Sequence, residues 1–211
     1  MNNLKIIVST ALVSQYDLPV SHHDQNFDLT IDERYREYEE CLNIIKSFGY
    51  DFIIMETVSE HDLFLENFGK VIYTNVNNRS FKNRGSNYIN AMKNALDTLE
   101  FEDDDLIIHI TGRYPLVDNT FIERCKVIES DGCFGKDYLG QFYLFLYALR
   151  YKKLKKLLNS IDVEYFDSSG VNLERVFSEF LENDNLDFVD KLGIIGRQSN
   201  SPKSIYGQTI F

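Results

Sequence analysis

Short apolar runs rich in β-branched residues recur along this chain, and segments with helical spacing of their apolar side chains separate them. This alternation is typical of a largely parallel sheet, because each connection between parallel strands needs a crossover, usually a helix. The sequence therefore predicts an α/β fold of the Rossmann-like class, with a central, mostly parallel sheet of about six strands flanked by helices.

The same periodicity places the individual elements. Strands are expected at 4–9, 52–57, 71–74, 105–110, 132–135 and 192–195, with an antiparallel edge strand at 162–166. Helices are expected at 59–68, 86–100, 118–129 (capped by Asp118), 139–159 and 172–182. A capping box of Thr30 and Glu33 predicts one more helix, which begins there and buries apolar side chains as far as Ile45.

The 211-residue chain carries a formal net charge of −11. This charge argues against nucleic acid or anionic membrane as a main partner, because both select basic surfaces. An acidic protein can still bind a nucleotide where its cations are local, and Arg79, Lys82, Arg84 and Arg113 fall within one short region.

The bulk properties indicate one domain over 1–197, followed by a polar tail or linker at 198–211 that would lead to further domains of a longer, monomeric protein. No segment reaches the roughly 18 apolar residues of a membrane span, and the N-terminus lacks signal-peptide features. Cys41, Cys125 and Cys133 have no metal-ligand spacing, so we expect buried, reduced thiols and a cytoplasmic protein.

The turn after the expected strand 105–110 is the main candidate for a binding site. Ligands of open α/β sheets bind beyond the carboxyl ends of the strands. Thr111 offers a hydroxyl there, Gly112 permits an unusual φ, and Arg113 brings a permanent charge. His109 lies on the same strand, as a ligand contact or as a core histidine. The alternative for Arg113 is a structural ion pair.

The loop 75–84 and the helix after it form a second candidate, because N–H groups and the helix dipole favour phosphate. The alternative is a solvated loop. The expected phosphate-binding residues in this region are Arg79, Arg84, Gly85, Asn87 and Asn90.

Other strand ends add further candidates. Ser9, Thr10 and Ala11 end the first strand with small side chains that let a base or ribose approach. Asp137 follows strand 132–135 and is the carboxylate best placed for catalysis or for a metal. Glu174 is a second candidate acid, although a first-turn glutamate is also explained by the helix dipole. Arg197 is a further candidate for a phosphate contact.

Three conspicuous patterns are interpreted as structural. The acids Glu102 to Asp105 precede a strand, so they lie at the amino edge as a solvated turn. The pair His22 and His23 with Asp24 is a weak metal pattern. The basic run 150–156 is expected to be a solvated helix end, with membrane contact as the alternative. Fingerprints of dinucleotide-binding, P-loop and Gly-x-Ser-x-Gly enzymes are absent from the sequence.

The order of elements resembles that of the GT-A-type glycosyltransferases. Arg84 and Gly85, then Ala91, Asn94 and Ala95, then an apolar strand look like the segment that leads to the metal motif of that fold. The whole also resembles the N-terminal glycosyltransferase domain of a chlorella-virus protein that builds capsid glycans, which would place the protein in the host cytoplasm.

The resemblance implies transfer of a hexose or deoxyhexose, such as glucose or rhamnose, from a UDP-sugar to a glycan acceptor. It also implies a divalent cation, Mn²⁺, for which Asp137 is the candidate ligand. The chain departs from the family because Thr111-Gly112-Arg113 stands where an Asp-x-Asp motif is usual. Catalytic roles are expected for Arg113, Asp137 and Glu174. The alternatives are a nucleotidyltransferase and a non-enzymatic interaction domain.

Overall fold

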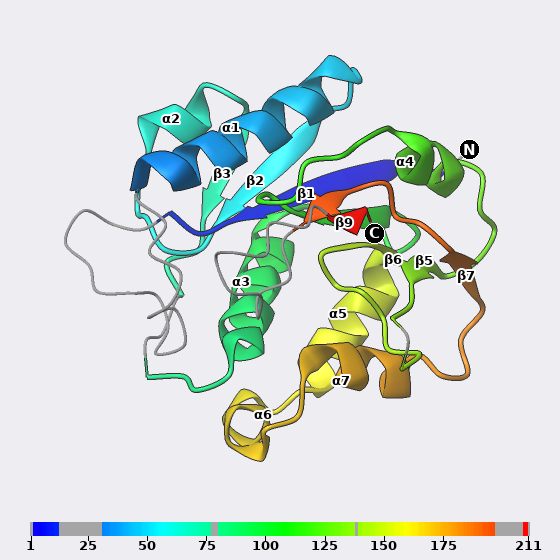
Figure 1. Cartoon of the computed structure of the whole chain (residues 1–211). Helices are drawn as coiled ribbons and strands as arrows, with labels where there is room; N and C mark the ends of the chain where they lie inside the picture. The colour runs from blue at the N-terminus through cyan, green and yellow to red at the C-terminus, as the bar shows by residue number, and fades with distance from the viewer. Residues whose placement is uncertain (1, 13–30, 77–79, 138, 197–208, 211) are drawn as a thin grey trace.

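The computed structural model describes residues 2–12, 31–76, 80–137, 139–196 and 209–210. Its centre is a seven-stranded sheet in the order β3-β2-β1-β4-β6-β5-β7 (Figure 1). The strands are β1 (Leu4–Thr10), β2 (Phe52–Glu56), β3 (Lys70–Tyr73), β4 (Leu106–Thr111), β5 (Gly132–Gly135), β6 (Leu146–Arg150) and β7 (Leu186–Val189). Within this sheet β6 runs antiparallel to both β4 and β5, and the other pairings are parallel. The predicted α/β fold is confirmed.

Helices cover both faces of the sheet (Figure 1). One face packs against α1 (Ile31–Ser47), α2 (Leu63–Glu66) and α4 (Thr120–Cys125). The other packs against α3 (Arg84–Thr98), α5 (Tyr151–Ser160), α6 (Val163–Ser169) and α7 (Leu173–Phe180). Neighbouring residues of β4 point to opposite faces, Ile107 into the α3 layer and Ile108 into the α1 layer. Burial on both faces explains why the strands are continuous apolar runs.

The predicted helix 139–159 is wrong over its first half. Residues Leu146–Arg150 form β6, and the helix α5 begins only at Tyr151. The side chains from Leu146 to Leu149 are all fully buried, because β6 lies between β4 and β5 inside the sheet. A short run that is apolar at every position does not distinguish a strand buried on both faces from a buried helix.

Other element boundaries also differ from the prediction. The segment 162–166 is not an edge strand, because it lies mostly in α6, where the Asp162 side chain caps the helix by accepting from the Tyr165 N–H. The edge strands of the sheet are β3 and β7. The predicted strand 192–195 is wrong, because this segment runs beside the one that follows β4, with Ile194 bridging Leu116. There β8 (Ile195–Gly196) pairs with β9 (Thr209–Ile210). The N-cap of α4 is Asn119 rather than Asp118.

Several predictions about side-chain environment are confirmed. Cys41, Cys125 and Cys133 are buried free thiols. Residues 102–104 are exposed, but Asp105 is wrongly placed in the solvated turn, since it is only 3% exposed and accepts from the side chain of Asn3. The prediction for the basic run is wrong about its place, because residues 150–156 lie at the amino end of α5, where basic side chains do not complement the helix dipole. Ion pairs join this run instead to Asp97, Asp103, Asp131 and Asp184. Across the described ranges, no helix is both long and apolar enough to cross a bilayer.

Candidate functional site

Backbone hydrogen bonds join the carboxyl ends of β1, β2, β3 and β4 at one edge of the sheet. The Gly112 N–H donates to the Ser9 carbonyl over 2.9 Å, and the Thr57 N–H donates to the Thr10 carbonyl over 3.1 Å. The Thr74 N–H donates to the Glu56 carbonyl over 2.9 Å. The segments that leave these four strands therefore start from a fixed framework, at the edge where open α/β sheets bind ligands.

The turn Thr111-Gly112-Arg113 is packed tightly against β1 and α1. A Cβ on Gly112 would lie 3.0 Å from the Ser9 carbonyl oxygen and 3.0 Å from Cδ1 of Tyr38. Gly112 does not use the conformational freedom that glycine permits, since its φ is not in the left-handed region. Glycine is required there because the backbones approach closely.

Arg113 leaves this turn half-buried beside two tyrosines. Its guanidinium carbon lies 5.9 Å from the centre of the Tyr114 ring. Burial raises the pKa of Tyr38, and the charges of Arg34 and Arg113 oppose that rise. Tyr38 also binds the end of β1, since its hydroxyl accepts from the Ala11 N–H over 2.8 Å and donates to the Ala11 carbonyl over 3.3 Å. Arg113 and the end of β1 therefore meet around one buried phenol.

His109 is a core histidine in this structure, only 1% exposed. Its Nδ1 lies 3.1 Å from the Leu144 carbonyl oxygen, and its Nε2 lies 3.0 Å from the Ser9 hydroxyl. The rings of Tyr88 and Tyr147 pack against the imidazole. Burial lowers the pKa of His109 to about 3. The imidazole is therefore neutral at physiological pH.

Glu56, at the end of β2, is a key residue of this edge that the sequence reasoning missed. Its carboxylate is fully buried and accepts four hydrogen bonds. The donors are the Thr10 hydroxyl and the N–H groups of Leu12, Val58 and Ser59. Burial raises the pKa of Glu56, although these hydrogen bonds oppose the rise. The signal in the sequence was an acid that ends an otherwise apolar run.

The amino end of α3 is already capped by the chain itself. The Asp167 carboxylate of α6 accepts from the Asn83 N–H over 2.8 Å, from the Lys82 N–H and from the Ser86 hydroxyl. The Asn83 side chain accepts from the Gly85 N–H. Side chains of the protein thus already accept hydrogen bonds from N–H groups that we expected to bind phosphate. On the same helix Arg84 is exposed, whereas Asn87 and Asn90 are half-buried.

Asp137 and Glu174 lie on neighbouring segments. Asp137 shapes the loop after β5, since its Oδ1 accepts from the N–H groups of Leu139 and Gln141, each over 2.8 Å. Gln141 in turn accepts from the side chain of Asn172, the N-cap of α7. Glu174 is half-buried in the first turn of that helix. This connection brings the two acids' segments together.

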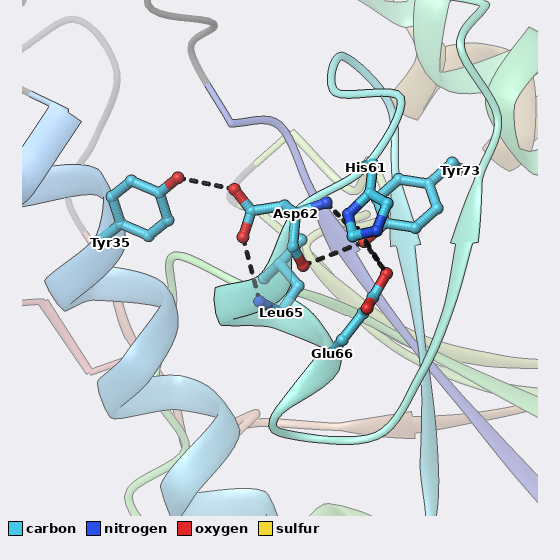
Figure 2. Close-up of polar contacts among 6 residues, drawn as sticks. All are labelled: Tyr35, His61, Asp62, Leu65, Glu66 and Tyr73. Carbon is cyan, nitrogen blue, oxygen red and sulfur yellow. Dashed lines mark hydrogen bonds and ion pairs between the residues drawn. The ribbon is translucent and has the colours of Figure 1, made fainter.

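A polar network fixes the segment after β2 at the rim of the sheet (Figure 2). The Tyr35 hydroxyl of α1 donates to Asp62, whose other carboxylate oxygen caps α2 at the Leu65 N–H. The Tyr73 hydroxyl of β3 accepts from the Asp62 N–H and donates to the Glu66 carboxylate. Burial raises the pKa of Tyr73 to about 12. The network joins α1, α2 and β3, and sequence reasoning did not predict it.

Among the described residues of this edge, the donor set does not fit a divalent cation. No group of three His, Cys, Asp or Glu side chains that could hold a metal exists in the part of the chain that the structure describes. A cationic residue, Arg113, stands after β4, and two N–H groups occupy one oxygen of Asp137. Arg79, Arg197 and the His22-His23-Asp24 pattern lie outside the described residues.

Comparison with known proteins identifies the fold through structure alone. No protein-family model matches the sequence, and no curated protein matches it. The chain is similar to a protein described as a nucleotide-diphospho-sugar transferase from Desulfovibrio desulfuricans G20, with a TM-score of 0.53 and 13% identity over 90% of this chain and 80% of that one. It has the fold of that class of protein.

Two further solved structures show the same fold. The glycosyltransferase GlyE of Streptococcus pneumoniae TIGR4 matches with a TM-score of 0.52 and 10% identity, over 89% of this chain and 45% of that one. A 4-diphosphocytidyl-2C-methyl-D-erythritol synthase matches with a TM-score of 0.54 and 12% identity, over 96% and 94% of the two chains. These comparisons support the resemblance to sugar transferases and give no support to a chlorella-virus relationship.

Proposed function

We propose that this protein is a glycosyltransferase that transfers a hexose or deoxyhexose, such as glucose or rhamnose, from a UDP-sugar to a glycan acceptor. One observation carries the proposal. The Thr111-Gly112-Arg113 turn holds a guanidinium at the carboxyl edge of the sheet, where the Gly112 N–H donates to the end of β1. In this class of fold that edge is where ligands bind.

Arg113 has the chemistry that a departing nucleoside diphosphate requires. Sugar transfer breaks the bond between the anomeric carbon and a phosphate oxygen, so negative charge develops on the diphosphate in the transition state. A guanidinium is always charged and presents paired N–H donors that match phosphate oxygens. Packing of the turn against Ser9 and Tyr38 restricts where this charge can lie. Arg84, Arg79 and Arg197 are further proposed phosphate contacts.

The two acids provide the second requirement of the reaction. In an inverting transfer a carboxylate removes the proton of the acceptor hydroxyl, and in a retaining transfer it stabilises the cationic sugar. We assign this role to Asp137 or to Glu174. The half-buried Glu174 is adjacent to the Asp137 loop through the contact between Asn172 and Gln141. The nucleoside is assigned to Ser9, Ala11 and Thr111, and the buried His109 contacts it only through Ser9. The Thr10 side chain, 2% exposed and hydrogen-bonded to Glu56, is not available to it.

We assign the stabilisation of the diphosphate charge to Arg113 rather than to a metal ion. The donor set described above does not fit the Mn²⁺ that GT-A enzymes usually bind, so we derive no step through a metal. Addition of EDTA tests this assignment directly. Catalysis that survives EDTA agrees with it, and strict dependence on Mn²⁺ contradicts it.

A nucleotidyltransferase is the second candidate, because a cytidylyl-transferring protein shares the fold. Such an enzyme binds a nucleoside triphosphate, whose larger negative charge needs cations or glycine-rich backbone loops. The segment 11–30 after the first strand contains no Gly, Lys or Arg and includes three aspartates. That composition favours a diphosphate-sugar over a triphosphate.

One experiment separates the candidates. The protein is incubated with UDP-, GDP- and CMP-sugars and with CTP, in Mn²⁺ or EDTA, while its thermal unfolding and the release of nucleotide are followed. A glycosyltransferase is stabilised by a nucleotide sugar and releases UDP when a glycan acceptor is added. Stabilisation by CTP with release of pyrophosphate indicates nucleotidyl transfer instead. If no nucleotide raises the melting temperature, the domain is not a nucleotide-dependent enzyme.

A further inference from the structure

Ser9 lies half-buried at the carboxyl edge of the sheet, and its hydroxyl oxygen contacts the buried His109. A serine hydroxyl has one proton to donate and two lone pairs that accept. The direction of that single proton decides which ligand groups the oxygen can bind. The contacts around His109 determine that direction.

The Leu144 carbonyl fixes the tautomer of the imidazole. A carbonyl oxygen only accepts hydrogen bonds, so the Nδ1 atom that lies 3.1 Å away must carry the proton. A neutral imidazole has a proton on one nitrogen only, so Nε2 is an acceptor. The neutral form is ensured because burial between the rings of Tyr88 and Tyr147 disfavours the charged imidazolium.

The Ser9 proton is therefore used inside the protein. Its hydroxyl donates to Nε2 of His109 over 3.0 Å, and only the oxygen lone pairs remain for a ligand. The neighbouring groups of β1 offer no substitute donor. The Thr10 hydroxyl donates to Glu56 and is 2% exposed, while the Ala11 N–H donates to Tyr38.

We propose that Ser9, oriented by His109, is an acceptor-only subsite that binds an N–H or O–H donor of the nucleoside and excludes phosphate oxygens. The inference rests on the proposed function and names the part of the nucleotide that β1 contacts. Phosphate oxygens are themselves acceptors at neutral pH, so they would repel the Ser9 lone pairs. The diphosphate then lies toward Arg113, and the nucleoside lies over Ser9. His109 is a positioning residue, because it acts only through Ser9.

A uridine nucleotide has three such donors: the imino N3–H and the 2′- and 3′-hydroxyls of the ribose. Calorimetric titration with UDP, N3-methyl-UDP, 2′-deoxy-UDP and 3′-deoxy-UDP removes them one at a time. We expect the wild-type protein to bind one of these analogues about 5- to 10-fold more weakly than UDP, the usual effect of one lost hydrogen bond.

The Ser9→Ala variant distinguishes a direct contact from an indirect one. It is expected to bind UDP about 5- to 10-fold more weakly and to bind UDP and that one analogue equally well. Ser47→Ala, at the far end of α1, is the matched control and should behave as wild type. In His109→Gln the side-chain amide can donate to Ser9 and free the serine proton, so discrimination against the analogue should fall although Ser9 is present.

Two results overturn the inference while the proposed function stands. One is that Ser9→Ala, still folded by circular dichroism, binds UDP as tightly as wild type. The other is that it still binds that one analogue more weakly than UDP, by the same factor as wild type does. If the wild-type protein does not bind UDP at all, the proposed function fails first, and the inference fails with it.

Discussion

Replacement of Gly112 by alanine tests how tightly the candidate site is built. The added Cβ would lie 3.0 Å from the Ser9 carbonyl oxygen, 3.0 Å from Tyr38 Cδ1 and 3.2 Å from Thr10 Cγ2. Favourable contacts between carbon atoms lie at about 3.5–4.0 Å, so two rigid neighbours, a strand carbonyl and a buried ring, would have to move.

The size of the effect follows from this overlap. Inserting a methyl group into a packed site costs about 1–3 kcal/mol. For a chain of this length that corresponds to a fall in melting temperature of about 2–12 °C. UDP-sugar affinity should fall as well, because the methyl group displaces the turn that carries Arg113.

Gly69→Ala is the matched control for this substitution. Its Cβ would lie 3.7 Å from the Phe52 carbonyl oxygen, which is an ordinary contact, and its φ is not left-handed. We expect its stability to change by less than about 0.5 kcal/mol. Thermal unfolding followed by circular dichroism compares the two variants. If Gly112→Ala melts at the same temperature as Gly69→Ala, the turn is not packed as described.

Three further predictions concern ionisable groups. Burial raises the folded-state pKa of Glu56 above its ordinary value of 4.5, so wild type should lose stability relative to Glu56→Gln as the pH rises from about 4.5 through the folded-state pKa. Urea unfolding at several pH values measures this difference, and a wild type that gains stability relative to the variant over that range would contradict the assignment. Burial lowers the pKa of His109 from 6.5 to about 3, so its imidazole NMR signals should not titrate between about pH 5 and pH 8. The stability that the neutral ring contributes above pH 6.5 should be lost as the pH falls toward 3. A midpoint near 6.5 would mean that the ring is solvated. The hydrogen bond from the Asn83 N–H lowers the pKa of Asp167, so Asp167→Asn should melt at a lower temperature than wild type at pH 7. The difference in melting temperature should narrow as the pH falls below 3.8 and through the folded-state pKa. A difference independent of pH would show that the charge of Asp167 does not stabilise the amino end of α3.

The local pattern of the sequence was enough to predict the strand–helix order that sets the α/β class. The error at β6 has a physical cause, since Leu146 to Leu149 are apolar at every position and are buried on both faces. No two-residue alternation remains to distinguish such a strand from a helix. The antiparallel direction of β6 arises from long-range pairing with β4 and β5, which local periodicity does not encode.

The sequence was enough to locate the residues at the strand ends, but it does not show which groups they form hydrogen bonds with. The positions of Ser9, Thr111 and Arg113 follow from where β1 and β4 end. The hydrogen-bond donors of the buried Glu56 carboxylate could not be predicted, because they come from the last residue of β1 and from the segments that follow β1 and β2. The same holds for Asp167, which binds the N–H groups just before α3, more than 80 residues earlier in the chain.

The central claim is that Arg113 supplies the charge that binds the diphosphate of a UDP-sugar. Calorimetric titration of UDP-glucose and UDP-rhamnose into wild type, Arg113→Ala and Asp104→Ala tests it most directly, with melting temperatures measured in parallel. Asp104 is exposed at the amino edge of β4, so its loss should leave affinity unchanged. Hydrogen bonds to charged groups contribute about 1.5–3 kcal/mol, so Arg113→Ala should bind about 10- to 100-fold more weakly. Equal affinities of the two variants, or no binding of either sugar nucleotide by the wild type, would contradict the claim.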